Sequence, residues 1–140
     1  MTQQHIIEKV HGLKTKMDLL NLLNELKRED LGKDCHRFTM NQINFYCNPN
    51  RNSKKRYKDF TIPKKSGKPR TISAPKGSLK MILTYLNKIL KAMYEPKEAA
   101  MGTVSGRSIA DNEAVHTGRN YGSNVDLEDF FPSVRQARIW

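Results

Sequence analysis

The sequence predicts an α+β fold with a helical N-terminus, a cationic β-hairpin, a long amphipathic helix and a short strand near residue 126. Apolar residues recur at helical spacing over residues 15–32 and 78–95, whereas residues 57–72 have strand-forming residues on both sides of a Lys-Ser-Gly-Lys turn. The chain has 140 residues and a mean hydropathy of −0.71. The length is therefore that of one domain, and its hydrophobic core is expected to be modest.

Two helices in the first third of the chain are predicted from capping boxes. Thr15 lies three residues before Asp18, an amphipathic run of leucines follows, and Gly32 should stop the helix. A second, shorter helix is predicted after Thr39, which has Gln42 three residues later. It should end before Pro49, because the residue before a proline disfavours helical geometry.

The hairpin is predicted from Tyr57, Phe60 and Ile62 on one side of the turn and from Thr71 and Ile72 on the other. Pro63 and Pro69 flank the turn and have no backbone N–H to donate to a ladder. The strands are therefore expected to loosen at these prolines, so that a cationic tip projects as a mobile finger.

The long helix is expected to begin at Ser78, which can cap it, and to end at Pro96. Its apolar residues keep to one helical face: Leu79, Ile82, Leu83, Leu86, Ile89, Leu90, Met93 and Tyr94. Ser108 and Asp111 predict the start of a polar helix that runs to about residue 117. Residues 123–127 are expected to form the short strand, and a further helix is expected to begin at Pro132 and Ser133.

The charge of the chain is +11, and residues 51–70 contain nine basic residues against the single acid Asp59. Aromatic and aliphatic residues interleave with these charges, which favours a folded basic surface over a solvated loop and makes nucleic acid the leading partner.

Cys35 and Cys47 form neither a zinc pattern nor a disulfide framework, and the scattered histidines do not suggest a metal cluster. Neither a membrane span nor a secretory signal is found, so a cytoplasmic protein is expected.

Three blocks of sequence together resemble the bacterial reverse transcriptases of the retron and group II intron-like branch. They are FTIPKKSGKPRTISAPKGSLK (60–80), GRSIADNEAVH (106–116) and VDLEDFFPSV (125–134). The resemblance implies that residues 1–120 form the fingers of a right-hand polymerase and that residues 121–140 begin the palm. It also implies RNA-directed DNA synthesis, with an RNA template, a DNA primer, dNTPs and two Mg²⁺ ions as partners and cofactors, in a bacterial cytoplasm.

The resemblance assigns a role to individual residues. Asp126 matches the first catalytic, metal-binding carboxylate, and the carbonyl of Leu127 would supply a further hard oxygen ligand. The implied dNTP-binding residues are Lys64, Lys65, Arg70, Asp129 and Phe131. The candidate nucleic-acid-binding residues are Arg51, Lys54, Lys55, Arg56, Lys58, Lys68, Arg107 and Asn112. Arg107 and Asn112 fit a template contact and a structural role at a helix start about equally well.

Parts that the family requires are missing from these residues. The aromatic-x-Asp-Asp turn and the thumb do not occur, and the chain stops just after a helix begins, so a fragment that does not polymerise alone is expected. The remaining palm and thumb would come from further sequence or from a second polypeptide, and a cognate structured RNA is a further possible partner. The alternative is a non-catalytic RNA- or DNA-binding module derived from polymerase fingers.

Overall fold

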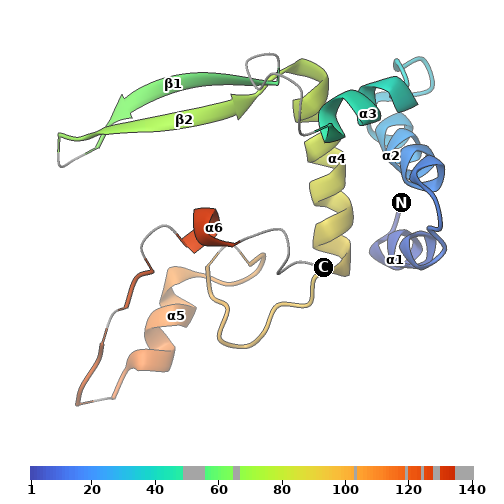
Figure 1. The fold of residues 1–140 in the computed structure, drawn as a ribbon. Coiled ribbons are helices and arrows are strands. Elements are labelled where there is room, and N and C mark those ends of the chain that lie inside the picture. Colours follow the sequence, from blue (N-terminus) through green and yellow to red (C-terminus); the bar gives the residue numbers. More distant parts are fainter. Residues whose placement is uncertain are drawn as a thin grey trace. The chain divides into compact units, whose positions relative to one another are not determined.

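The structure is a computed structural model that describes residues 1–48, 56–64, 67–102, 104–118, 120–123, 125–127 and 130–134. It divides the chain into two compact units, Met1–Glu95 and Pro96–Trp140, and each unit is described by itself. The first unit contains α1 (Gln3–His11), α2 (Lys16–Leu31), α3 (Met40–Cys47), β1 (Tyr57–Pro63), β2 (Pro69–Pro75) and α4 (Gly77–Met93). Figure 1 shows this order along the chain.

The predicted capping boxes are confirmed. Thr15 and Thr39 each accept a hydrogen bond from the backbone N–H three residues later, and the side chains of Asp18 and Gln42 bond back to the cap residues. Gly32 ends α2 with a positive φ of 89°, a backbone conformation that favours glycine. The helical N-terminus also includes α1, where the side chain of Thr2 accepts a hydrogen bond from the backbone N–H of His5.

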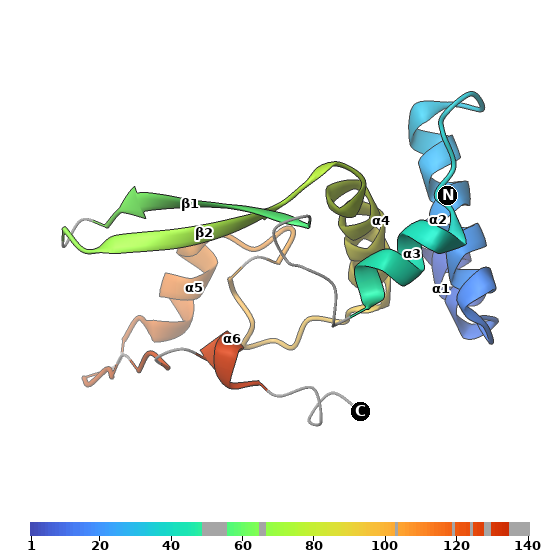
Figure 2. The same cartoon turned by 45° about the horizontal axis from the view of Figure 1, so that its top comes forward.

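The hydrophobic core of the first unit lies between α1, α2, α3 and α4, which group together in both views (Figures 1 and 2). Leu23 and Leu26 of α2 are its most buried side chains, at 1% and 0% exposed. The ring of Phe38 meets Tyr85 of α4 edge to face, with centroids 6.1 Å apart. The side-chain amide of Asn24 holds the backbone of Phe38 through two hydrogen bonds, of 3.0 and 2.6 Å.

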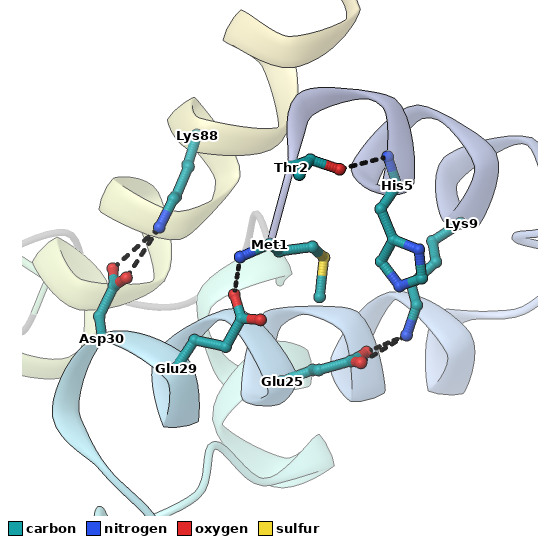
Figure 3. Close-up of polar contacts among 8 residues, drawn as sticks. All are labelled: Met1, Thr2, His5, Lys9, Glu25, Glu29, Asp30 and Lys88. Carbon is teal, nitrogen blue, oxygen red and sulfur yellow. Dashed lines mark hydrogen bonds and ion pairs between the residues drawn. The ribbon is translucent and has the colours of Figure 1, made fainter.

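Ion pairs connect the helices at the edge of this core (Figure 3). The N-terminal amine of Met1 contacts Glu29 at 2.7 Å, and Lys9 of α1 pairs with Glu25 of α2. Lys88 of α4 reaches Asp30 at the end of α2 at 2.8 Å. Ion pairs at a solvent-accessible edge each add little stability, so the apolar core holds the helices together.

The hairpin is confirmed, but the expectation that its strands loosen at the prolines is wrong. The register runs from Tyr57 opposite Pro75 to Pro63 opposite Pro69. Beyond the proline pair, the N–H of Lys64 donates to the carbonyl of Lys68 at 2.9 Å. Opposed residues in an antiparallel ladder alternate between bonded and non-bonded pairs, so the prolines occupy a non-bonded pair and remove no ladder bond.

The long helix begins and ends earlier than predicted. Lys76 is its N-cap residue and makes no side-chain capping bond, so the predicted cap at Ser78 is wrong. Ser78 lies within the first turn, after Gly77, whose φ of +38° is a backbone conformation that favours glycine. The helix ends at Met93, before Pro96.

The second unit contains α5 (Ile109–His116) and α6 (Phe130–Ser133). The predicted capping box at Ser108 and Asp111 is confirmed. The predicted strand over residues 123–127 is wrong: Ser123 and residues 125–127 are irregular, and β1 and β2 form the only sheet among the described residues. A strand needs a hydrogen-bonding partner, and the described part of this unit offers none. The last helix begins two residues before the predicted Pro132.

No helix in the described parts of the chain is long and apolar enough to cross a membrane.

The capping box of α2 should make stability depend on pH. Hydrogen bonds from the Thr15 side chain and from the backbone N–H groups of Lys14 and Thr15 lower the pKa of Asp18 below its usual value. A carboxylate whose pKa is lower in the folded state stabilises it above the unfolded pKa, about 3.9, and this stabilisation is lost as the pH falls through the lower folded pKa. We expect Asp18→Asn to remove part of the loss of stability on acidification, measured by urea unfolding at neutral and acid pH.

Thr15→Ala provides the matched test, because it removes the largest cause of the shift and leaves the carboxylate in place. It should flatten the same part of the pH profile. An unchanged profile in Asp18→Asn would show that this carboxylate does not contribute.

Candidate nucleic-acid and nucleotide interface

The hairpin has two chemically different faces. Directly opposed residues of an antiparallel pair share a face, so the register assigns Phe60 with Ile72, and Ile62 with Arg70, to one side. Phe60 and Ile62 are 44% and 42% exposed. The opposite face is small and polar only in its middle, where Thr61 pairs with Thr71 and Asp59 with Ser73; the prolines and Tyr57 lie at its ends.

The tip of the hairpin brings together two predicted dNTP-binding residues, Lys64 and Arg70, and the predicted nucleic-acid-binding residue Lys68. The backbone bond between Lys64 and Lys68 continues the alternation of the ladder, which assigns both lysines to the side of Arg70. All three residues are exposed. Gly67 closes the turn with a φ of +79° and donates its N–H to the carbonyl of Lys64 at 2.9 Å. That the exposed cations share a side of the hairpin with apolar residues was not predicted. Counting alternate residues outward from the turn could have revealed it, because side chains alternate between the two faces of a strand.

Arg56 lies just before the hairpin and contacts α3. Its guanidinium donates a hydrogen bond to the carbonyl of Asn48 and lies over the ring of Phe45, with the guanidinium carbon 5.9 Å from the ring centroid. Lys58 lies on β1 opposite Ala74 and is exposed. The predicted residues Arg51, Lys54, Lys55 and Lys65 lie outside the described residues.

Arg107 holds the loop before α5. Its Nη1 donates to the carbonyl oxygens of Lys97 and Glu98, at 2.7 and 2.9 Å, and to that of Ala100. These carbonyls accept no hydrogen bond from a helix or a sheet, so the bonds from Arg107 satisfy them, which favours the structural alternative for Arg107. Asn112 lies exposed on α5, where its backbone N–H donates to the Ser108 carbonyl.

Asp126 lies in an irregular, exposed stretch between Val125, 80% exposed, and Leu127, 64% exposed. Because residues 125–127 form no strand, Asp126 does not lie at the strand end that the sequence predicts. The exposed carboxylate and the adjacent carbonyl are hard oxygen donors of the kind that Mg²⁺ prefers, so they fit part of a magnesium site. Within the described residues, no group of three His, Cys, Asp or Glu side chains could bind a metal ion.

Two predicted nucleotide contacts follow Asp126. Asp129 lies outside the described residues. Phe131 belongs to the backbone of α6, and its side chain also lies outside the described part. The hairpin and Asp126 belong to different units, so the predicted site residues fall into two separate groups.

Comparison with known proteins relates this chain to one group of enzymes. It is 41% identical over 83 residues to the retron Mx162 reverse transcriptase of Myxococcus xanthus, a match that covers 59% of this chain and 17% of that protein. It is 31% identical over 87 residues to the retron Ec86 reverse transcriptase of Escherichia coli, covering 61% of this chain and 27% of the relative. The retron Mx65 reverse transcriptase of Myxococcus xanthus is 41% identical over 83 residues, 19% of its length.

The matched region thus spans between 17% and 27% of the length of these relatives. No model of a known protein family matches the chain, and no solved structure does.

Proposed function

We propose, from its similarity to retron reverse transcriptases, that this chain is the fingers and the start of the palm of an RNA-directed DNA polymerase. The observation that carries the proposal is the identity of 31% to 41% with the retron reverse transcriptases named above. The complete enzyme would extend a DNA primer with dNTPs on an RNA template. Since the match covers at most 27% of these three relatives, this activity belongs to a longer polypeptide or to an assembly with a palm and thumb partner.

In this proposal Asp126 is a catalytic residue. Its carboxylate and the carbonyl of Leu127 would hold Mg²⁺, together with carboxylates from outside the described residues. When bound, the two ions would stabilise the attacking and leaving oxygens of the nucleotidyl transfer. The exposure of Asp126 supports the role, because a carboxylate that binds a metal ion together with other acids must be accessible to them.

The cationic tip of the hairpin would bind the triphosphate of the incoming dNTP. Lys64 and Arg70 carry fixed positive charges on the same side of the hairpin, and Asp59, the acid of β1, belongs to the other side. Arg70 suits this role because its guanidinium can donate two parallel hydrogen bonds to phosphate oxygens. Lys65 and the backbone N–H of Asp129 are further candidates for the same phosphates.

Arg70→Ala should raise the KM for dNTP about 10-fold or more in the primer-extending enzyme, with little change in template affinity, because it removes a charge-assisted phosphate contact. Steady-state primer extension over a range of dNTP concentrations measures this. Thr71→Ala, on the opposite face of the same strand, is the matched control and should leave KM nearly unchanged. A variant weakened only in template affinity would assign Arg70 to the template instead.

Phe131 would select deoxynucleotides. A bulky ring beneath the sugar of the incoming nucleotide leaves no room for a 2′-hydroxyl, so Phe131→Ala should increase ribonucleotide incorporation relative to dNTP incorporation. Extension with each nucleotide type measures the ratio, and Phe130→Ala is the control at the neighbouring ring. An unchanged ratio would leave Phe131 with a packing role.

The direct test of the proposed function is primer extension on an RNA template by the enzyme that contains this chain, with Mg²⁺ and dNTPs. Template-dependent synthesis is expected. Nucleic-acid binding without synthesis, with every candidate palm and thumb partner, would instead support a non-catalytic RNA- or DNA-binding module.

A further inference from the structure

The apolar surface of α4 is wider than the core covers. In both views α1 and α2 lie on one side of α4 (Figures 1 and 2). The core takes one stripe of the helix, which consists of Ile82, Tyr85, Ile89 and Ala92. A second apolar stripe, which we call the leucine seam, consists of Leu83, Leu86, Leu90 and Met93. The seam lies about 100° around the helix from the first stripe, and none of its residues belongs to the core of the described chain.

The leucine seam is open to solvent. Leu83, Leu90 and Met93 are 37%, 57% and 37% exposed, and Leu86 is partly buried. Side chains of this kind gain free energy when they leave water, so the seam is a surface that another element can cover. The core already holds α4 as a helix, and an occupant of the seam would therefore not have to order this backbone.

The spacing of the seam is that of a helix–helix contact. Its residues are separated by three, four and three positions, the spacing of a coiled-coil seam with a seven-residue repeat. Such a stripe packs against another helix at a small crossing angle. A nucleic acid would instead need cations along the stripe, and the seam itself has none.

The seam is complementary to itself. The spacing of three, four and three reads the same from both ends, so a two-fold axis superposes one seam on another run in the opposite direction. Leu83 then lies opposite Met93 of the second copy, and Leu86 lies opposite Leu90 of the second copy. Every apolar residue of the seam thus meets an apolar residue.

The exposed flank of the seam fits the same arrangement. Lys80, Asn87 and Tyr94 follow this flank at intervals of seven residues, and all three are exposed. The two-fold axis brings Lys80 near the ring of Tyr94 of the second copy, where a cation over an aromatic face is favourable. It brings Asn87 near Asn87 of the second copy, so no like charges are opposed along the flank.

We propose that α4 forms an antiparallel, two-fold dimer of this chain through the leucine seam. Leu83, Leu86, Leu90 and Met93 form the contact, and Lys80 with Tyr94 fixes its direction. The dimer does not depend on the proposed polymerase function, because it uses neither the hairpin tip nor Asp126.

Sedimentation equilibrium of the nuclease-treated 140-residue chain, over a range of protein concentrations and at low and high salt, tests the inference. A monomer–dimer equilibrium is expected. The dimer should become tighter at high salt, because the net charge of +11 makes the copies repel each other and salt screens this repulsion. A dimer bridged by residual RNA would show the opposite dependence.

Leu83→Lys with Leu90→Lys should raise the dissociation constant of the dimer about 100-fold or more, because each substitution buries an unpaired charge and occurs twice in a two-fold contact. The matched control is Leu31→Lys with Thr84→Lys, which adds the same charge at exposed positions outside the seam and should dimerise like the wild type. Leu83→Gln with Leu90→Gln removes apolar surface without adding charge and should weaken the dimer about 10-fold or more. Circular dichroism checks that the variants stay folded.

A wild-type chain that is monomeric at every concentration would overturn the inference and leave the seam to a different helix, such as one of a palm and thumb polypeptide. A dimer that weakens with salt would overturn it too, as would a dimer that both seam variants keep or that the control loses equally. Primer extension by a monomeric enzyme would leave the polymerase proposal intact, and a dimer without synthesis would leave the seam assignment intact.

Discussion

Asp126→Ala should reduce primer extension more than about 100-fold in the enzyme that contains this chain, since even the loss of an outer-shell partner of a metal ligand costs about 10–100-fold. Template affinity should stay nearly unchanged, because the lost carboxylate holds metal and does not contact the nucleic acid. Extension rates at saturating dNTP, together with RNA binding in the same buffer, separate the two effects.

Asp126→Asn sharpens the test, because it keeps the shape of the side chain and removes its charge. A neutral amide is a poor ligand for Mg²⁺ in place of a carboxylate, so this variant should be almost as inactive as the alanine variant. Glu113→Ala removes another exposed acid from the same unit and is the control, expected to extend normally. Extension near the wild-type rate by either Asp126 variant would refute the catalytic assignment.

Leu26→Ala should lower the free energy of unfolding of this chain by about 2–5 kcal/mol, the range for a leucine deleted from a core. Leu26 is 0% exposed and packs in the core between the helices of the first unit, so its removal leaves a cavity that neighbouring side chains fill only in part. Urea unfolding followed by circular dichroism measures the change.

Leu31→Ala is the matched control for this prediction. Leu31 ends the same helix and is 56% exposed, so its truncation should change stability by no more than about 0.5 kcal/mol. Equal losses in the free energy of unfolding would contradict the structure, in which Leu26 belongs to the buried face of α2 and Leu31 does not.

The helix starts were predictable from sequence because each depends on residues within one turn. Thr15 with Asp18, Thr39 with Gln42, and Ser108 with Asp111 all form the expected capping boxes. Ser78 resembles a capping residue by type alone, but the cap position falls on Lys76, two residues earlier. The type of a residue alone therefore does not show at which residue the backbone enters a helix.

The candidate site was predictable only in part. The pairing of Ile62 with Arg70 and the shared side of the tip cations follow from the turn, but only the structure shows that Phe60 and Ile62 stay exposed there. The bonds from Arg107 to loop carbonyls and the contact between Arg56 and α3 join residues across loops, where no periodic pattern constrains geometry.

The sequence was enough to predict the helices that open with capping boxes, the hairpin, the concentration of positive charge and the three blocks that resemble a reverse transcriptase, because these depend on neighbours in the chain. The three-dimensional structure was needed to show that residues 125–127 form no strand and that Arg107 bonds to carbonyls of the preceding loop. Both findings depend on hydrogen-bonding partners that lie farther away in the sequence, and folding selects those partners by burying apolar surface and satisfying backbone hydrogen bonds.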